Sequence, residues 1–265
     1  AARAHAELVR TLDATPPAYA HVPLILGEDG KRLSKRHGAA SVLNYRDEGY
    51  LPEALLNYLV RLGWSHGDQE IFSIEEMTAL FDIGDVNKSA ASINPEKLLW
   101  LNQHYIKSGN TGRLTGMLEV IMKQQGMAVE HGPVLTEVVE VQKQRVRTMI
   151  EMAVQSICFY KDVDCFDESA AKKHLQPEIL EPLVSLQGQL QKLADWDNEN
   201  IHDRIRAVAE KYNIKMGKIA QPLRVAVTGG AVSPSIDDTL RLVGKQRTIA
   251  RLDKAIDYIR CQATS

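Results

Sequence analysis

The sequence predicts a mainly α-helical protein that begins with a small mixed α/β segment. Apolar residues recur at helical spacing along most of the chain, which is typical of amphipathic helices that pack on one another. One short apolar run, residues 21–26, is instead typical of a buried strand. The chain has 265 residues, of which 44% are hydrophobic, so it can bury a sizeable core and form two or three domains.

The amino-terminal third alternates short helices with turns. We expect a helix over residues 4–12, which ends before the proline pair 16–17, and then the strand at 21–26. A further helical stripe has Pro52 in its first turn and Gly63 at its end. Its apolar members are Leu51, Leu55, Tyr58, Leu59 and Leu62.

Two more helices are predicted before a glycine-containing break. Ser73 and Glu76 have the spacing of a capping box at the start of one helix, and the other runs from Pro95 to about Ile106. We interpret residues 109–112, Gly-Asn-Thr-Gly, as a loop and a candidate domain boundary.

The carboxy-terminal half predicts a helical assembly. Its longest helical pattern covers residues 134–160, and the polar segment 162–167 interrupts it. Later helices are expected to start at Ser169, to carry Pro182 early, and to end at the glycine pair 229–230. The last three apolar stripes are Ile201, Ile205, Val208 and Tyr212; Met216, Ile219, Leu223 and Val227; and Ile249, Leu252, Ile256 and Ile259.

Composition excludes several classes of protein. The net charge of −2 argues against a protein that coats nucleic acid by bulk electrostatics, although it leaves room for local basic stripes. The three cysteines and eight histidines show no metal-ligand spacing, so we expect no zinc site and no other metal site. No apolar run reaches the roughly 18 residues of a membrane span. Unpaired cysteines suit a reducing cytoplasm, where we expect the protein.

Residues 31–38, Lys-Arg-Leu-Ser-Lys-Arg-His-Gly, form the most informative stretch. Five of these eight side chains can carry positive charge, and a turn at residues 27–30 places them on a loop after a strand. A loop crowded with Lys and Arg suits the triphosphate charge of phosphoryl or nucleotidyl transfer. A solvated charge run or a generic nucleic-acid patch fits the composition equally well.

The sequence around this loop, residues 21–39, resembles the second signature of class I aminoacyl-tRNA synthetases, and it is most similar to that of bacterial glutamate–tRNA ligases. Segments 49–65, 97–106 and 220–229 resemble the same family in the same order. The family's first signature, a His-x-Gly-His type motif that grips ATP, is absent. The resemblance therefore implies the carboxy-terminal portion of a synthetase, without the catalytic half that precedes it in the family.

The resemblance also implies a division into four parts. Residues 1–39 would be the end of a catalytic domain with its KMSKS-like loop, a small α/β remnant. Residues 40–108 would form a stem-contact fold, which touches the inner corner of the tRNA. Residues 109–190 and 191–265 would be two helical anticodon-binding subdomains. In the stem-contact fold, the backbone contacts expected from this resemblance are Lys88, Ser89 and Lys97.

Four loop residues are candidates for the ATP site. By resemblance Lys35 is catalytic and stabilises the pyrophosphate charge, a role that suits a mobile point charge on a long stem. Arg32 stands where the signature often has its first lysine, and Arg36 adds charge. The hydroxyl of Ser34 could fix the loop or could be phosphorylated. The alternative for Arg32 and Arg36 is a solvated surface.

Arg145 is a candidate for anticodon recognition. In a continuous helix its neighbours would be Val138, Val141 and Met149, an unusual setting for an arginine. By resemblance an arginine in this helix reads the last anticodon base, which suits a planar fork of donors. An arginine that snorkels over a helix–helix seam explains the pattern equally well.

A second group of anticodon candidates surrounds the glycine pair 229–230. By resemblance Arg224 contacts a splayed base or its phosphate, and four residues cup an anticodon base: Thr228, Ser233, Pro234 and Ile236. Ile236 would offer an apolar surface to the base, and the hydroxyls would meet its edges. Simple helix capping is the alternative for Thr228 and Ser233. A basic run is a further candidate for phosphate contacts: Lys245, Arg247 and Arg251.

The three tryptophans are expected in the core, although each could instead be a platform on which a base stacks. They are Trp64, Trp100 and Trp196.

The leading interpretation is part of a glutamate–tRNA ligase, which activates glutamate with ATP and transfers it to tRNA. The resemblance implies ATP, Mg²⁺ and tRNA(Glu) as ligands, and we expect a monomer. Alone, the chain should bind tRNA weakly and catalyse no reaction. A stand-alone tRNA-binding or regulatory module and a helical protein-interaction scaffold are the alternatives.

Overall fold

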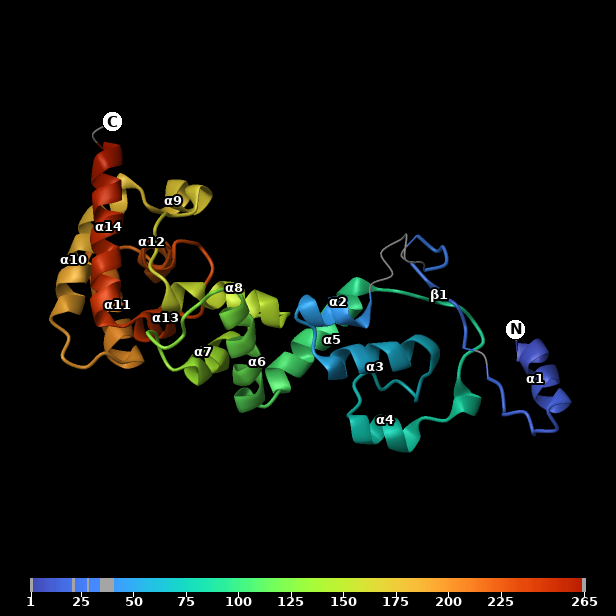
Figure 1. Cartoon of the computed structure of the whole chain (residues 1–265). Coiled ribbons are helices and arrows are strands. Elements are labelled where there is room, and N and C mark those ends of the chain that lie inside the picture. The colour runs from blue at the N-terminus through green and yellow to red at the C-terminus, as the bar shows by residue number, and fades with distance from the viewer. Residues whose placement is uncertain (1, 21, 28, 34–40, 264–265) are drawn as a thin grey trace. The chain divides into compact units, whose positions relative to one another are not determined.

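The computed structural model describes residues 2–20, 22–27, 29–33 and 41–263. Its contacts divide the chain into two compact units, Ala1–Asn102 and Gln103–Ser265. Each unit is described below by itself. Helices dominate both, as Figure 1 shows, so the predicted mainly α-helical class is confirmed.

The first unit contains short helices and two very short strands. In order these are α1 (Ala2–Thr11), β1 (Ile25–Leu26), α2 (Val42–Asp47), α3 (Pro52–Gly63), α4 (Ile74–Leu80), a 3-10 turn (Ile83–Asp85), β2 (Ala91–Ser92) and α5 (Pro95–Ser108), in which the chain passes into the second unit. The predicted helices at 4–12, from Pro52 and from Pro95 are confirmed. The strand predicted at 21–26 is shorter than expected, and its first residue lies outside the described residues.

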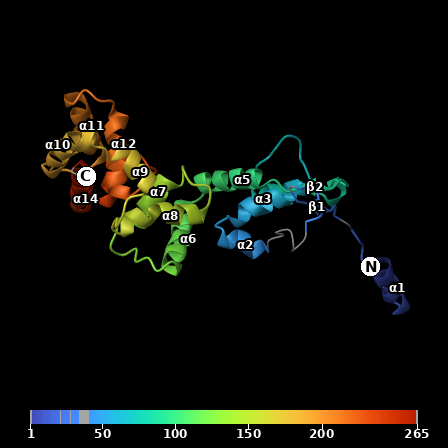
Figure 2. The same cartoon turned by 90° about the horizontal axis from the view of Figure 1, so that it is seen from above.

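β1 and β2 pair in parallel, with Ile25 opposite Ala91 and Leu26 opposite Ser92 (Figure 2). On its other side β1 meets the chain again after the 27–30 turn, where Leu26 bridges Arg32 in antiparallel fashion. Both residues of β1 are only half-buried.

The core of the first unit forms where α3 meets the segment that follows it. Trp64, Phe72 and Met77 make one apolar cluster. Ser73 caps α4 by accepting from the Glu76 amide, and the Glu76 carboxylate accepts from the Ser73 amide, so the predicted capping box is confirmed.

Two asparagines that are fully buried tie the loops of this unit to its helices. Asn57 Oδ1 accepts from the Phe72 amide at 2.7 Å, and Asn57 Nδ2 donates to the Glu70 carbonyl at 2.9 Å. Asn102 Oδ1 accepts from the Leu51 amide at 2.7 Å. These bonds satisfy backbone groups that α3 and the following loop would otherwise bury without partners.

Glu70 joins two basic side chains of the first unit. Its carboxylate lies 2.7 Å from Lys97 Nζ and 3.0 Å from Arg61 Nη2. The hydrogen bond from Lys97, followed by that from Arg61, lowers the pKa of Glu70. The expected contact of Lys97 with an RNA backbone would therefore compete with this ion pair.

The second unit is helical throughout its described residues. Its elements after α5 are α6 (Thr111–Gln124), α7 (Leu135–Gln142), α8 (Met149–Tyr160), α9 (Glu168–His174), a 3-10 turn (Pro177–Ile179), α10 (Leu180–Gln191), α11 (Asn198–Lys211), α12 (Met216–Thr228), α13 (Ile236–Val243) and α14 (Lys245–Ala263). The apolar stripes predicted for α11, α12 and α14 all contribute to its core.

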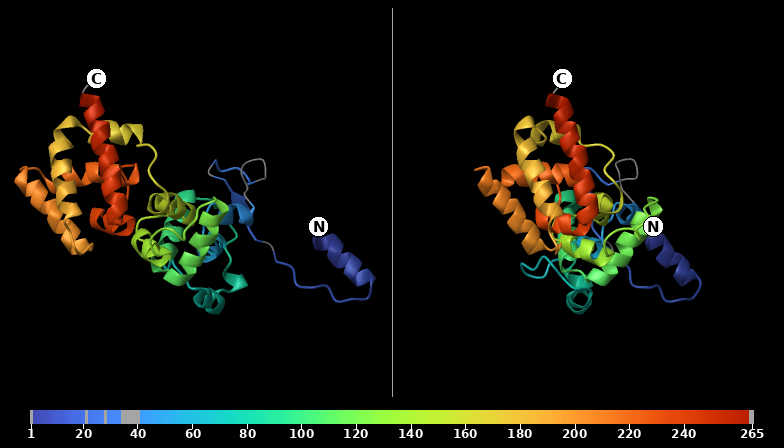
Figure 3. Two further views of the ribbon diagram at one scale, coloured as in Figure 1. Left: turned by 60° about the vertical axis from the view of Figure 1, so that its left-hand side comes forward. Right: turned by 90° about the vertical axis from the view of Figure 1, so that its left-hand side faces the viewer.

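The second unit is built around α12. Ile219, Leu223 and Val227 are fully buried, and α12 packs against α9, α11, α13 and α14. The long helix α14 lies beside α10, as Figures 1 and 3 show. The helices α6, α7 and α8 pack together, and α7 and α8 also contact α13.

Two predictions for this unit are wrong. Residues 109–112 are not all loop, because the Asn110 side chain accepts from the Arg113 amide and so starts α6 at Thr111. The pattern 134–160 is not one helix either, because α7 ends at Gln142 and Thr148 caps the start of α8. The apolar spacing continues through the break because Val146, within the turn, is fully buried.

The tryptophans divide between core and surface. Trp64 is 1% exposed, and half-buried Trp196 packs on the core and donates from Nε1 to the Leu240 carbonyl. Trp100 is 48% exposed, so its predicted place in the core is wrong. Its helical neighbours Leu98 and Leu101 occupy the buried face of α5 instead.

Asn57→Ala should destabilise the first unit. The Phe72 amide and the Glu70 carbonyl would each lose a buried partner, and such losses cost about 1–3 kcal/mol each. Urea unfolding followed by Trp64 fluorescence should show a loss of about 2–4 kcal/mol. The control Asn87→Ala, at an exposed position, should stay within about 0.5 kcal/mol of the parent chain. Equal stability of the two variants would contradict the role given to Asn57.

Candidate functional site

The strongest site candidate lies at the carboxy-terminal end of α12. Gly229 terminates the helix with a φ of 81°, as the sequence predicted. A Cβ added at Gly229 would lie 3.1 Å from Val163 Cγ1, so glycine also permits close approach of the 161–166 linker. The chain then runs through residues 229–235 to Ser235, whose hydroxyl accepts from the Asp238 amide and caps α13.

Arg224 ties α12 to the start of α13. Its Nε donates to Ser233 Oγ at 2.8 Å, and its Nη2 donates to the Pro234 carbonyl at 3.2 Å. Both partners are neutral. Among the ion pairs of the described residues, none includes Arg224. The guanidinium therefore fixes the loop through neutral partners and has no carboxylate in direct contact among these ion pairs.

A second cation lies near Arg224. Burial lowers the pKa of Arg224, the charge of Arg145 lowers it further, and Asp237 acts in the opposite direction. The structure thus brings together two arginines that are 79 positions apart in the sequence. The Asp237 carboxylate, which lies 3.9 Å from His202 Nδ1, partly offsets the charge of Arg224.

Arg145 occupies the turn between α7 and α8, not a helix. Its amide donates to the Gln142 carbonyl at 2.9 Å, and its side chain is exposed. The prediction that apolar helical neighbours surround it is wrong because the helix has already ended.

Ser233 serves the protein's own hydrogen bonds. The residue is 4% exposed, and its Oγ receives the Arg224 Nε hydrogen and lies 2.9 Å from Thr239 Oγ1. The hydroxyl of Thr228 likewise donates to the Arg224 carbonyl and accepts from the Gly230 amide. Capping, the alternative for Thr228, describes these bonds well.

Ile236 and Pro234 lie in the core. Ile236 is 5% exposed and belongs to the main apolar cluster, and Pro234 is buried. This differs from the expected open surface for a base, because the first turn of α13 faces α11 and α12. The open apolar side chain of this loop is Val232, which is 67% exposed. In the sequence, the only sign that Val232 would be exposed is its position two residues after the glycine pair 229–230.

The basic run of α14 points inward. Arg251 is 2% exposed, donates from Nη2 to the Lys161 carbonyl at 2.8 Å, and donates from Nη1 to the Val227 carbonyl. Arg247 donates to the carbonyls of Phe159 and Lys161. Lys245 donates to the Leu193 carbonyl at 2.6 Å. These donors satisfy helix ends, so the expectation of phosphate contacts is wrong for buried Arg251.

The structure describes only part of the candidate ATP loop. Arg32 is exposed and lies beside β1, where the Leu33 amide donates to the Ile25 carbonyl at 2.9 Å. Ser34, Lys35 and Arg36 lie outside the described residues. Within the described part of the chain, no group of three or more His, Cys, Asp or Glu residues is placed to hold a metal ion. No described helix is both long enough and apolar enough to cross a bilayer.

Comparison with protein families identifies the second unit. Residues 113–256 match the anticodon binding domain, and residues 1–100 match the catalytic domain of class I tRNA synthetases (E and Q). The chain therefore belongs to the anticodon binding domain family.

The relatives are glutamate–tRNA ligases. Glutamate–tRNA ligase 1 of Alkalilimnicola ehrlichii is 52% identical over 256 residues, which are 97% of this chain and 54% of that protein. Glutamate–tRNA ligase 2 of Halorhodospira halophila is 51% identical over 253 residues, or 96% of this chain and 54% of that protein. The chain thus spans about half the length of the curated relatives it matches.

A solved structure supports the same relationship. The crystal structure of a glutamate tRNA ligase from Elizabethkingia meningosepticum matches with a TM-score of 0.82 and 30% sequence identity. The match covers 97% of this chain and 54% of that one. The resemblance to glutamate–tRNA ligases that the sequence motifs indicated is confirmed.

Arg251→Met should destabilise the second unit. The buried Val227 carbonyl would lose this donor and the Lys161 carbonyl would keep only its bond from Arg247, at about 1–3 kcal/mol for each lost bond. Urea unfolding followed by far-UV circular dichroism should show a loss of about 2–4 kcal/mol. The control Arg206→Met removes an arginine whose side chain is 57% exposed and should cost less than about 1 kcal/mol. A smaller effect for Arg251 than for Arg206 would refute its structural role.

Proposed function

We propose that this chain is part of a glutamate–tRNA ligase and that its second unit binds the anticodon of tRNA(Glu). The observation that carries the proposal is a pair of cations: Arg145 in the exposed turn 143–148, and Arg224 of α12, which donates to Ser233 and Pro234 of the loop 229–235. Both belong to the region that matches the anticodon binding domain.

The arrangement suits an anionic, single-stranded partner. The charge of Arg145 lowers the pKa of Arg224, so a nearby anion would stabilise the Arg224 guanidinium, and RNA phosphates supply one. Arg145 is exposed in a turn, so its planar fork is free to meet a base edge or to stack on an unpaired base. Val232 adds an open apolar surface to the same loop region.

The buried candidates have supporting roles in this proposal. Ser233 and Pro234 orient Arg224 through the two hydrogen bonds described above, and Thr228 closes the end of α12. Ile236 anchors α13 in the core. Direct contact with RNA is therefore assigned to Arg145 and Arg224.

The first unit belongs to the activation step of the proposed enzyme. ATP would be its substrate, accompanied by Mg²⁺, and the loop with Arg32, Ser34, Lys35 and Arg36 would face the phosphates. Lys35 would stabilise the charge that develops on pyrophosphate. We keep the four-part division 1–39, 40–108, 109–190 and 191–265, a monomeric state and a cytoplasmic location as parts of the proposal.

Arg145→Gln should weaken discrimination at the third anticodon base. Filter binding at two salt concentrations would compare tRNA(Glu) transcripts that differ only at this base, with the parent chain and the variant. Loss of an arginine that contacts a base edge costs about 1–3 kcal/mol and relaxes specificity at that position.

The matched control is Arg206→Gln, which removes an exposed arginine of α11 and should leave discrimination unchanged. Equal discrimination by the parent chain and Arg145→Gln would remove Arg145 from this role. Absence of any tRNA binding would overturn the proposed function.

A further inference from the structure

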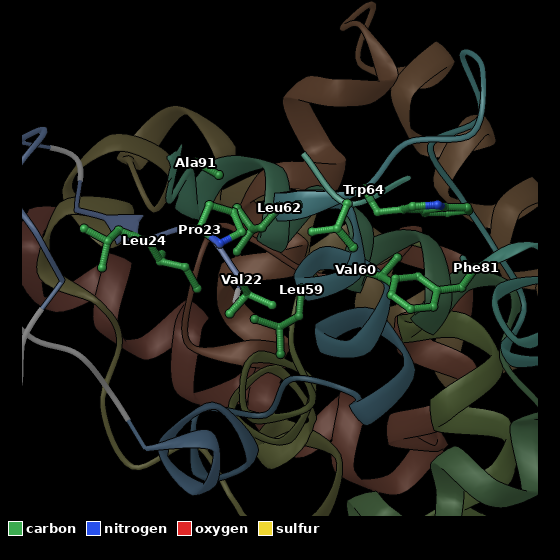
Figure 4. Close-up of a pocket in the computed structure, with 12 residues that line it drawn as sticks. Val22, Pro23, Leu24, Leu59, Val60, Leu62, Trp64, Phe81 and Ala91 are labelled. Atoms are coloured by element: carbon green, nitrogen blue, oxygen red, sulfur yellow. The ribbon is translucent and has the colours of Figure 1, made fainter. Parts of the chain in front are cut away.

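The helix α3 borders two chemically different environments in the first unit. Leu59, Val60 and Leu62 line an apolar cavity of about 360 Å³, shown in Figure 4, and a cavity of this kind does not orient a charged ligand. The described residues that line it do not include Arg61. Arg61 Nη2 instead lies 3.0 Å from Glu70 Oε1, so a charged cluster forms on the same helix.

Glu70 divides its carboxylate between two cations of unequal freedom. Oε1 pairs with Arg61, and Oε2 lies 2.7 Å from Lys97 Nζ. The Arg61 side chain is 15% exposed, whereas that of Lys97 is 37% exposed. Buried Asn57 donates to the Glu70 carbonyl at 2.9 Å and so fixes the backbone that carries the carboxylate. Lys97 is therefore the partner that can leave most easily, because its long stem can carry the ammonium to solvent.

Arg61 has donors that are not in use. In the part of the chain that the structure describes, its Nε and Nη1 are buried and have no hydrogen-bond partner. Unsatisfied donors of a buried charged group are unfavourable, and an arginine can bind both oxygens of one carboxylate through two parallel bonds. A Glu70 oxygen that Lys97 releases can therefore be accepted by Arg61.

Lys97 lies in the first turn of α5, where a cation is unfavourable unless an anion is near. The amino-terminal end of a helix carries partial positive charge, and Lys97 adds its own. The turn is fixed on α3, because Asn94 Oδ1 accepts from the Lys97 amide at 3.0 Å and the Asn94 amide donates to the Tyr58 hydroxyl at 2.6 Å. In the free chain Glu70 supplies the compensating charge, and a phosphate would supply it equally well.

We propose that RNA releases Lys97 from Glu70: a phosphate of tRNA(Glu) takes the Lys97 ammonium, and Glu70 turns its second oxygen to Arg61 Nε. No proton moves and no covalent bond changes in this exchange. Binding at Lys97 must first replace the ion pair with Glu70, which weakens chance contacts with other polyanions. This inference rests on the proposed function.

A double-mutant cycle tests the exchange. Filter binding of a tRNA(Glu) transcript across a salt series would compare the parent chain, Glu70→Gln, Lys97→Met and the double variant. Glu70→Gln should raise the affinity about two- to fivefold, the range that an exposed ion pair allows. Lys97→Met should reduce the salt slope by about 1, because one phosphate contact is lost, and should abolish the gain from Glu70→Gln.

The matched control is Glu96→Gln, which removes the same charge from an exposed carboxylate next to Lys97 in the chain. Any gain from this general change in charge should persist in Lys97→Met. An unchanged salt slope in Lys97→Met, which keeps the Glu70–Arg61 pair, would overturn the exchange and leave the proposed function standing. So would a gain from Glu70→Gln that survives Lys97→Met. Absence of RNA binding by the parent chain would overturn both.

The Nε–H group of Arg61 reports the second arrangement directly. In a chain with isotope-labelled arginine, its NMR signal is identified by its loss in Arg61→Lys. The signal should move downfield in Lys97→Met and when RNA binds the parent chain, because the released Glu70 oxygen accepts this hydrogen. A signal that stays unchanged in both would overturn the exchange.

Discussion

The buried guanidinium of Arg251 holds the second unit together at its functional end. It reaches from α14 to the last turn of α12 at Val227 and to the end of α8 at Lys161. A buried arginine costs desolvation free energy, which its carbonyl partners and the Asp162 carboxylate, 3.6 Å from Nη2, offset only in a fixed geometry. Arg251 therefore joins the ends of α8 and α12, and with the end of α12 it fixes the start of the loop 229–235, which is part of the proposed RNA-binding region.

The two arginines of the proposed site are less buried than Arg251 and have different partners. Arg224 binds neutral groups, and Arg145 lies close enough to lower its pKa further. Two like charges near each other, only partly offset by Asp237, favour an anionic ligand. The three arginines thus have distinct roles that follow from their surroundings: backbone carbonyls and Asp162 for Arg251, the loop 229–235 for Arg224 and solvent for Arg145.

Local features of the fold were predictable from the sequence, and long-range ones were not. The capping box at Ser73 and the stop at Gly229 depend on neighbouring residues, so their patterns are visible in the sequence. The break at 143–148 was hidden because buried Val146 preserves the apolar spacing across a turn. The inward direction of Arg251 was hidden because its carbonyl partners lie 24 and 90 positions away. For the site, the sequence indicated the segments but not which side chains reach solvent.

The first unit differs from the second in what it leaves open. The second buries its apolar stripes among α9–α14, whereas the first exposes Val22 and Phe81 beside a two-residue parallel sheet. Both units nevertheless form apolar cores of their own, with Trp64, Phe72 and Met77 in that of the first.

Hydrogen–deuterium exchange of the chain with and without a tRNA(Glu) transcript tests the central claim most directly. Bound RNA should slow exchange of the backbone amides of the turn 143–148 and the loop 229–235, while those of α10, which carries none of the proposed contacts, stay unchanged. Slowing confined to α10, or no change in the turn and the loop when RNA is bound, would contradict the assignment of RNA binding to this end of the second unit.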